Sequence, residues 1–155
     1  MKSFLKKRKK RWFFLIRATK RLRAVLKIAQ QASCHHGKQG DESMYYLHAL
    51  IEEGTGVGFH IIINYAKNPE ILFSNVKTVI AKTSNGTQCD SLTDRCDIVQ
   101  YTVEASRGLK DKHVGTEHLL LGLLRSDNCQ AAKTLHEHGL SYDSAEKAIS
   151  KVRIM

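Results

Sequence analysis

The chain has 155 residues and a formal net charge of +10, which is unevenly distributed. Residues 1–27 contain twelve Lys/Arg and no acidic residue, whereas the rest of the chain contains thirteen Lys/Arg and fifteen Asp/Glu. One proline and ten glycines exclude collagen-like and low-complexity proteins, and a chain of this length can bury a core without disulfides or metals. We therefore expect one near-neutral globular domain, or two very small ones, behind a basic arm.

The basic arm is predicted to span residues 1–19. Its composition fits four interpretations: a solvated tail, a membrane-surface anchor, a segment that binds nucleic-acid phosphates, or an organelle transit peptide. Aromatic side chains that enter the headgroup region, beside cations that meet anionic lipid, give the membrane interpretation its physical basis. The residues that would form this membrane or anion contact are Lys6, Lys7, Arg8, Lys9, Lys10, Arg11, Trp12, Phe13 and Phe14.

The apolar run Trp12–Ile16 is five residues long, shorter than the core of a signal peptide, about 7–15 residues, or a membrane span, about 20. The cysteines, Cys34, Cys89, Cys96 and Cys129, include no CxxC pair. Reduced thiols are the default where secretion is not indicated. We predict a cytoplasmic protein, with membrane association and a plastid or other organelle left open.

Helical periodicity predicts four helices over residues 20–81. Ser43 is the expected N-cap of the second helix, and Asn68-Pro69 suits the start of the fourth. Gly54 to Gly58 breaks the chain without the Gly-Lys-Ser/Thr of a nucleotide-binding loop. The predicted core residues are Leu22, Val25, Leu26, Ala29, Ala32, Tyr46, Leu47, Leu50, Ile51, Phe59, Ile62, Ile63, Ala66, Leu72, Val76, Val79 and Ile80. A polar linker follows at residues 82–92.

Residues 93–155 repeat this pattern of four predicted helices. Thr93 is the expected cap of the first helix, and Thr116 that of a leucine-rich helix beginning after Gly115. Gly122 costs about 1 kcal/mol of helix propensity, which predicts close approach of a neighbouring helix. Gly139 is expected to end the third helix in a Schellman-type cap. The predicted core residues are Ile98, Val99, Thr102, Ala105, Leu119, Leu120, Leu123, Leu124, Ala131, Ala132, Leu135, Leu140, Ala145, Ala148, Ile149 and Val152.

The two halves align without gaps, by the constant shift that places Ala32 on Ala105. Identical or conservative pairs fall at core and cap positions: Ala32/Ala105, Ser33/Ser106, Leu47/Leu120, Leu50/Leu123, Val25/Ile98, Leu26/Val99, Ser43/Thr116, Ile51/Leu124, Ile62/Leu135 and Val76/Ile149. The alignment predicts an all-α fold of about eight helices, in two four-helix repeats about a pseudo-two-fold axis. The expected boundaries are 1–19 for the arm, 20–81 and 93–155 for the repeats, and 82–92 for the linker.

The run Gly-Thr-Glu-His-Leu-Leu-Leu-Gly-Leu-Leu at residues 115–124 resembles the signature of the Clp N-terminal domain of ClpA- and ClpC-type AAA+ chaperones. The resemblance covers roughly residues 20–153, and Leu92-Thr93-Asp94-Arg95 resembles the opening of the family's second repeat. The structural positions that match its motif are Gly115, Thr116, His118 and Gly122. The resemblance implies the double-repeat fold and the docking of adaptors and substrates for a Clp chaperone–protease.

The resemblance to ClpC-type members also implies a pocket for phosphorylated arginine, for which only Thr93 and Glu117 match. A carboxylate would pair with the guanidinium, and a helix N-terminus with a hydroxyl would receive the phosphate. Met44 takes the place of Glu117 in the first repeat, so that the pocket there is predicted to be lost. The competing interpretation is that Glu117 only complements the helix dipole.

No chemistry of an enzyme is predicted. The sequence lacks a Walker A motif and HExxH, and His136 and His138 point in different directions on a helix. Cys129 beside His136 lacks an orienting third group, and Cys89 with Cys96 lacks zinc-ligand spacing. We predict no metal or cofactor. The leading hypothesis is a non-catalytic accessory protein of a Clp system, whose partners are Clp ATPase or protease components, adaptors or substrates. The alternative is a membrane-surface or nucleic-acid-associated protein acting through the arm, with the repeats as scaffold.

Overall fold

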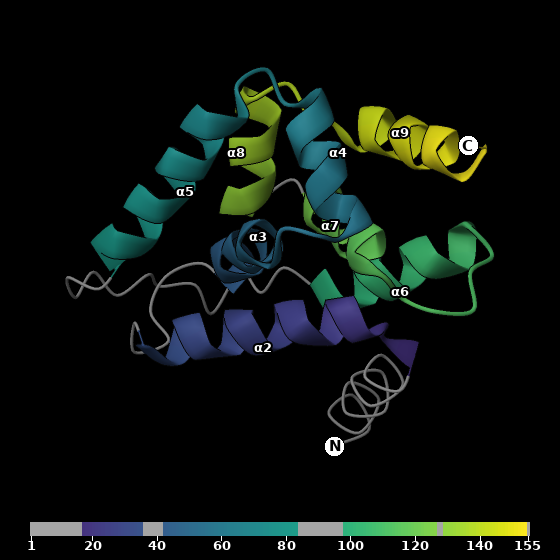
Figure 1. The fold of residues 1–155 in the computed structure, drawn as a ribbon, viewed down its shortest axis with the longest axis horizontal. Helices are drawn as coiled ribbons and strands as arrows, with labels where there is room; N and C mark the ends of the chain where they lie inside the picture. The colour runs from purple at the N-terminus through teal and green to yellow at the C-terminus, as the bar shows by residue number, and fades with distance from the viewer. Residues whose placement is uncertain (1–16, 36–41, 84–97, 127–128, 155) are drawn as a thin grey trace.

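The computed structural model describes residues 17–35, 42–83, 98–126 and 129–154, and within them the regular structure is entirely helical. The predicted all-α class is confirmed (Figure 1). The eight described helices are α2 (Lys20–His35), α3 (Glu42–Glu53), α4 (Val57–Tyr65), α5 (Pro69–Thr83), α6 (Ile98–Gly108), α7 (Thr116–Arg125), α8 (Gln130–Glu137) and α9 (Tyr142–Ile154).

The helices follow the periodicity of the repeat. The gapless alignment of the two halves pairs the first residue of α4 with that of α8, and the first residue of α5 with that of α9. The third helix of each half packs against the second helix of the other half, because α4 contacts α7 and α8 contacts α3. Figure 1 shows α3 and α7 at the middle of the molecule, with α2, α5 and α9 around them. The core is therefore shared between the two halves.

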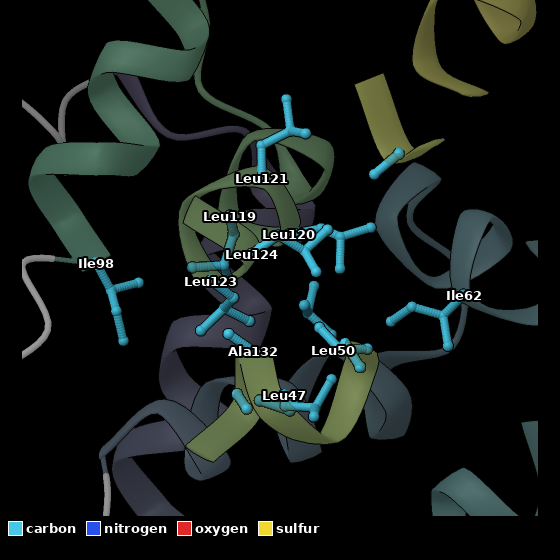
Figure 2. Close-up of a cluster of buried hydrophobic side chains, with 14 of the residues drawn as sticks. Leu47, Leu50, Ile62, Ile98, Leu119, Leu120, Leu121, Leu123, Leu124 and Ala132 are labelled. Carbon is cyan, nitrogen blue, oxygen red and sulfur yellow. The ribbon is translucent and has the colours of Figure 1, made fainter. Parts of the chain in front are cut away.

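Helix α7 is buried on almost every side. The five leucines of α7 are each at most 1% exposed: Leu119, Leu120, Leu121, Leu123 and Leu124. Leu121 is buried although it lies off the predicted apolar face. Figure 2 shows Leu120 and Leu123 on the side of α7 towards Leu47 and Leu50 of α3, and Leu121 on the opposite side. A helix that is apolar all round belongs in the middle of a fold.

Two residues predicted to be in the core are on the surface. Ile63 is 38% exposed and Val152 is 46% exposed, whereas the neighbouring Ile61 is buried in place of Ile63. Helical spacing of apolar residues permits more than one face on a short helix such as α4, and the contact with α7 selects Ile61 and Ile62. Apolar periodicity therefore located α4 correctly but misjudged one side of it.

Gly122 has the predicted role. A Cβ atom at this position would lie 2.4 Å from Thr102 Oγ1, 3.0 Å from Thr102 N and 3.1 Å from the Ile98 carbonyl oxygen. The backbones of α6 and α7 therefore touch at a point where any larger residue would separate them. This contact holds the first and second helices of the second half together.

Two further predicted helix boundaries are confirmed. Asn68 Oδ1 accepts a hydrogen bond from Ile71 N at 3.3 Å, with Pro69 as the first residue of α5. Gly139 has φ +86°, and Leu140 N donates to Leu135 O at 3.0 Å in the Schellman pattern. Leu140 is fully buried, and such burial frequently accompanies this motif.

The described part of the predicted arm is tied to the loop before α7. Thr19 N donates to Val114 O at 2.9 Å, and Val114 N donates to Arg17 O at the same distance, as in a parallel β-bridge. Ala18 and Val114 are both buried. The segment that leads into α2 therefore lies next to Val114, in the loop before α7. Within the described residues, no helix combines the length and apolar character needed to cross a bilayer.

Candidate functional site

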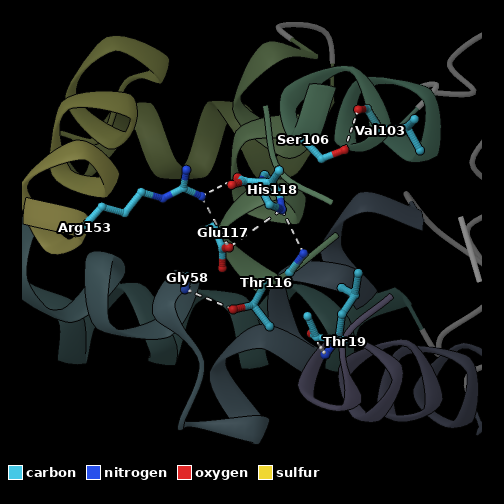
Figure 3. A network of polar contacts seen from close by, with 11 residues as sticks. Thr19, Gly58, Val103, Ser106, Thr116, Glu117, His118 and Arg153 are labelled. Carbon is cyan, nitrogen blue, oxygen red and sulfur yellow. Dashed lines mark hydrogen bonds and ion pairs between the residues drawn. The ribbon is translucent and has the colours of Figure 1, made fainter. Parts of the chain in front are cut away.

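The site lies at the N-terminus of α7, where Gly115 is the N-cap and Thr116 the first helical residue. The predicted N-cap role of Thr116 is therefore wrong. Figure 3 shows its hydroxyl turned away from its own helix, accepting a hydrogen bond from Gly58 N at 3.2 Å. Thr116 instead satisfies an amide in the first turn of α4, which lies in the other half of the molecule.

The predicted N-cap role of Ser43 is wrong for the same reason. It lies inside α3, fully buried, and its Oγ accepts from Ala131 N at 3.1 Å in the first turn of α8. The alignment of the two halves pairs Ser43 with Thr116, and it also pairs their donors Gly58 and Ala131. The two hydroxyls are therefore a reciprocal pair of caps, each made by one repeat for the other.

The cap of α7 itself comes from His118. Gly115 N donates to His118 Nδ1 at 2.8 Å, which leaves the ring proton on Nε2. Nε2–H then donates to Asp111 Oδ2 at 2.7 Å. His118 is 1% exposed, and because Nδ1 accepts from Gly115 N it does not donate to the Glu117 carboxylate 3.7 Å away. His118 has a structural role as a capping residue.

Asp111 joins this cap to the last helix. Its Oδ2 also accepts from Arg153 Nη2, and the same nitrogen lies 3.9 Å from Glu117 Oε1 (Figure 3). Partial burial raises the pKa of the Asp111 carboxyl, but the hydrogen bonds from Arg153 and His118 outweigh it and hold the pKa below its ordinary value. The result is a charged network across the α7–α9 contact.

This network predicts an acid-sensitive contribution to stability. Because the pKa of Asp111 is lower in the folded state than in the unfolded state, the stabilisation is fully present above the ordinary value of 3.8 and is lost as the pH falls through the folded-state pKa. The free energy of unfolding, measured with urea between about pH 6 and pH 3, should fall more steeply for wild type than for Asp111→Asn. Parallel curves for the two proteins would contradict the assignment.

Glu117 lies in the first turn of α7 with its side chain 17% exposed. A Cβ atom at Gly115 would lie 2.7 Å from both Glu117 carboxylate oxygens, so glycine there leaves room for the carboxylate to fold back towards the helix N-terminus. This position suits the dipole-complementing role, and the partial exposure leaves the carboxylate accessible to a ligand. Both interpretations of Glu117 keep a structural basis.

The other residues predicted for the site are only partly within the described structure. Thr93 and the arm residues 1–16 lie outside the described part of the chain. In the first repeat, Met44 and Tyr45 take the places of Glu117 and His118, and both are buried in the core. Ile80, in the place of Arg153, is buried as well. The positions of Glu117, His118 and Arg153 are thus filled in the first repeat by buried core residues, whereas the position of Asp111 lies outside the described residues.

Sequence reasoning missed Asp111 and Arg153. Arg153 lies in the last turn of α9, where a basic residue is already explained by the helix dipole. Asp111 lies in a loop 42 residues away from it along the chain. No local pattern connects the two, so only the packing of α9 against α7 brings them together.

Cys129, the candidate nucleophile, has a structural role in α8. Cys129 is fully buried as the N-cap of α8, where its thiol donates to Leu123 O and accepts from Ala132 N, both at 3.4 Å. No group of three potential metal ligands occurs in the described residues. An open hollow of about 550 Å³ lies away from Glu117, at the turn between α4 and α5, lined by Ile63, Lys67, Asn68, Pro69, Glu70 and Phe73.

The fold and site define a class: a helical domain of two interlocked repeats whose signature helix carries an acidic N-terminus. Residues 17–138 match the family model of the Clp repeat N-terminal domain, and the chain belongs to that family. It is similar to the "Negative regulator of genetic competence ClpC/MecB" of Bacillus subtilis, with 28% identity over 134 residues, 86% of this chain and 16% of the relative. It is equally similar, at 28% identity, to chaperone protein ClpB of Oceanobacillus iheyensis, covering 86% and 17% of the two chains.

Two further comparisons agree. The chloroplastic chaperone protein ClpC1 of Arabidopsis thaliana is 29% identical over 125 residues, 79% of this chain and 14% of the relative. A structure titled "Preliminary structural investigations of a malarial protein secretion system" has the same fold, with a TM-score of 0.69, 17% identity, and coverage of 87% and 93%. The chain spans about a sixth of the length of the curated relatives it matches.

Proposed function

We propose that this chain is a non-catalytic, accessory protein-binding module of a Clp chaperone–protease system, which contacts substrates, adaptors or Clp subunits through the double repeat. Membership of the Clp repeat family over residues 17–138 carries this proposal. The partner class is suggested by the similarity to ClpC/MecB, named as a negative regulator of genetic competence, and to a ClpB chaperone. The sequence contains no Walker A motif, so that no ATP hydrolysis is assigned to these residues.

The binding residue that we assign is Glu117. Its carboxylate is accessible at the N-terminus of α7, whereas Thr116 and His118 beside it are buried and hold the helix end in place. A carboxylate at a helix N-terminus can pair with a guanidinium while amides of the first turn receive an attached phosphate. The proposed ligand is therefore an arginine side chain, phosphorylated or not, of a substrate or adaptor, with Thr93 as a second predicted contact.

A second function, through the basic arm, is favoured by the eight Lys/Arg and the absence of acidic residues in residues 1–19. Such a segment attracts anionic lipid or nucleic-acid phosphates independently of the helical repeats. In this proposal the repeats act as a scaffold. The two functions differ in which residues are necessary.

The test is an affinity pull-down from the source organism with three variants, detecting Clp ATPase and protease subunits. We expect wild type and a variant lacking residues 1–16 to retain these subunits, and Glu117→Gln to lose at least half of them, because it removes the charge that pairs with arginine. Glu70→Gln is the matched control, since Glu70 is an exposed acidic residue in the first turn of α5. A wild-type pull-down that contains no Clp subunit would overturn the proposal. The second function is tested separately by liposome binding, and it is supported if deletion of residues 1–16 abolishes liposome binding while Glu117→Gln does not.

A further inference from the structure

The Glu117 site already has a guanidinium beside it. Arg153 reaches from α9 to the Asp111 carboxylate, and its Nη2 lies 3.9 Å from Glu117 Oε1 (Figure 3). An arginine side chain of a bound peptide would need the same carboxylate and the same space. The position of Arg153 therefore bears directly on whether the site is open.

We propose that Arg153 is a built-in occupant of the Glu117 site, which an incoming arginine side chain must displace. The proposal rests on the proposed function, because it assigns a regulator to that same site. Arg153 places a guanidinium against the carboxylate of Glu117, as the ligand would. The apparent affinity for a ligand is then the intrinsic affinity multiplied by the fraction of molecules in which Arg153 is released.

Release of Arg153 requires little unpacking. Lys151, Val152 and Arg153 are all exposed, and Ile149 is the last buried residue among the α9 side chains that the structure describes. The last turn of α9 can therefore fray, or the Arg153 side chain can rotate, while the core contact of the helix stays intact. The Arg153 side chain is 38% exposed, so a ligand can approach it from solvent.

The repeat architecture does not require a charged residue at this position. Ile80 is the equivalent of Arg153 in the first repeat, and with Met44 it belongs to the buried core. The same packing position is thus filled by an apolar side chain where no acidic site exists. The second repeat has both Glu117 and the charged Arg153, whereas the first repeat has neither charge. This is the pattern expected if Arg153 pairs with the Glu117 carboxylate.

The experiment is a calorimetric titration of a synthetic peptide carrying one phosphoarginine, with a phosphoserine peptide as the control for phosphate alone. Arg153→Gln should bind the phosphoarginine peptide about threefold to tenfold more tightly than wild type, because the competing guanidinium is gone. Lys151→Gln removes the same charge from the same exposed turn and should leave the affinity unchanged. Adding Glu117→Gln to Arg153→Gln should abolish the gain.

The outcomes separate the two proposals. If wild type binds and Arg153→Gln binds equally or more weakly, Arg153 is a structural link between α7 and α9 and this inference is wrong, while the proposed site stands. If neither protein binds the phosphoarginine peptide, Glu117 is not a phosphoarginine site and this inference falls with it, while the pull-down still decides the proposed function. Arg153→Lys gives a second measurement should Arg153→Gln unfold, with an intermediate gain expected because an ammonium pairs less well than a guanidinium with carboxylates.

Discussion

Replacing Gly122 with alanine is expected to lower the free energy of unfolding by about 2–3 kcal/mol. Helix propensity alone predicts the opposite, a gain of about 1 kcal/mol. Packing decides the sign, because the new methyl group would lie 2.4 Å from Thr102 Oγ1 and about 3 Å from backbone atoms of α6. Thr102 cannot turn away freely, since it is fully buried and its hydroxyl donates to Ile98 O at 2.6 Å. Urea unfolding of both proteins measures the difference.

Gly108→Ala is the matched control. Gly108 is the last residue of α6, and a Cβ atom there would meet no other atom within 4 Å. We expect its stability to stay within about 0.5 kcal/mol of wild type. Adding Thr102→Ala to Gly122→Ala should recover part of the loss only, because Thr102 N and Ile98 O remain close. A stabilised Gly122→Ala protein would show that α6 and α7 do not pack as closely as described.

Removing the two reciprocal caps together is expected to cost about 2–4 kcal/mol, roughly 1–2 kcal/mol for each hydroxyl. The variants are Ser43→Ala and Thr116→Val, of which the second keeps the shape of the side chain. Each leaves a buried amide, Ala131 N or Gly58 N, without its hydroxyl acceptor. Because each bond joins the two repeats, we expect both single variants to lower the urea midpoint by similar amounts.

Ser150→Ala serves as the control for loss of a serine hydroxyl. Ser150 is exposed, and its Oγ bonds only within α9, to Glu146 O. Its effect should stay within about 0.5 kcal/mol. If Thr116→Val were as harmless as Ser150→Ala, the hydroxyl of Thr116 would not be an inter-repeat cap. The comparison of Ser43→Ala with Thr116→Val then tests whether the pseudo-symmetry extends to energies.

The cap pair also matters for the site, because it sets where the N-terminus of α7 lies. Glu117 follows Thr116, whose hydroxyl accepts a hydrogen bond from Gly58 N. The carbonyl of Thr116 also lies close to Gly58, because a Cβ atom at Gly58 would be 2.8 Å from Thr116 O. Gly56 makes room in the same way, since a Cβ atom there would lie 2.5 Å from Thr116 Oγ1. The glycine-rich break therefore accommodates α7 and is not a phosphate loop. A site on α7 is held by the other half of the molecule.

Much of the fold could be predicted from the sequence. The gapless alignment of the two halves paired the helices, and leucine spacing placed α7 in the core. Gly122 signalled a close helix contact because a glycine inside a helix is costly unless space is short. The signature at residues 115–124 identified the family, which the match over residues 17–138 shows. These features are local or periodic, and the physical chemistry of single helices explains them.

The tertiary structure alone decided which groups meet across helices. A hydroxyl at a helix start reads as a cap for that helix, and only packing revealed that Ser43 and Thr116 cap helices of the opposite repeat. In the same way, no sequence pattern connects Asp111 or Glu117 with Arg153, which the packing of α9 brings to both carboxylates. Periodicity specifies which face of a helix is apolar. It does not specify the neighbour that this face meets, because that choice depends on all the helices packing together.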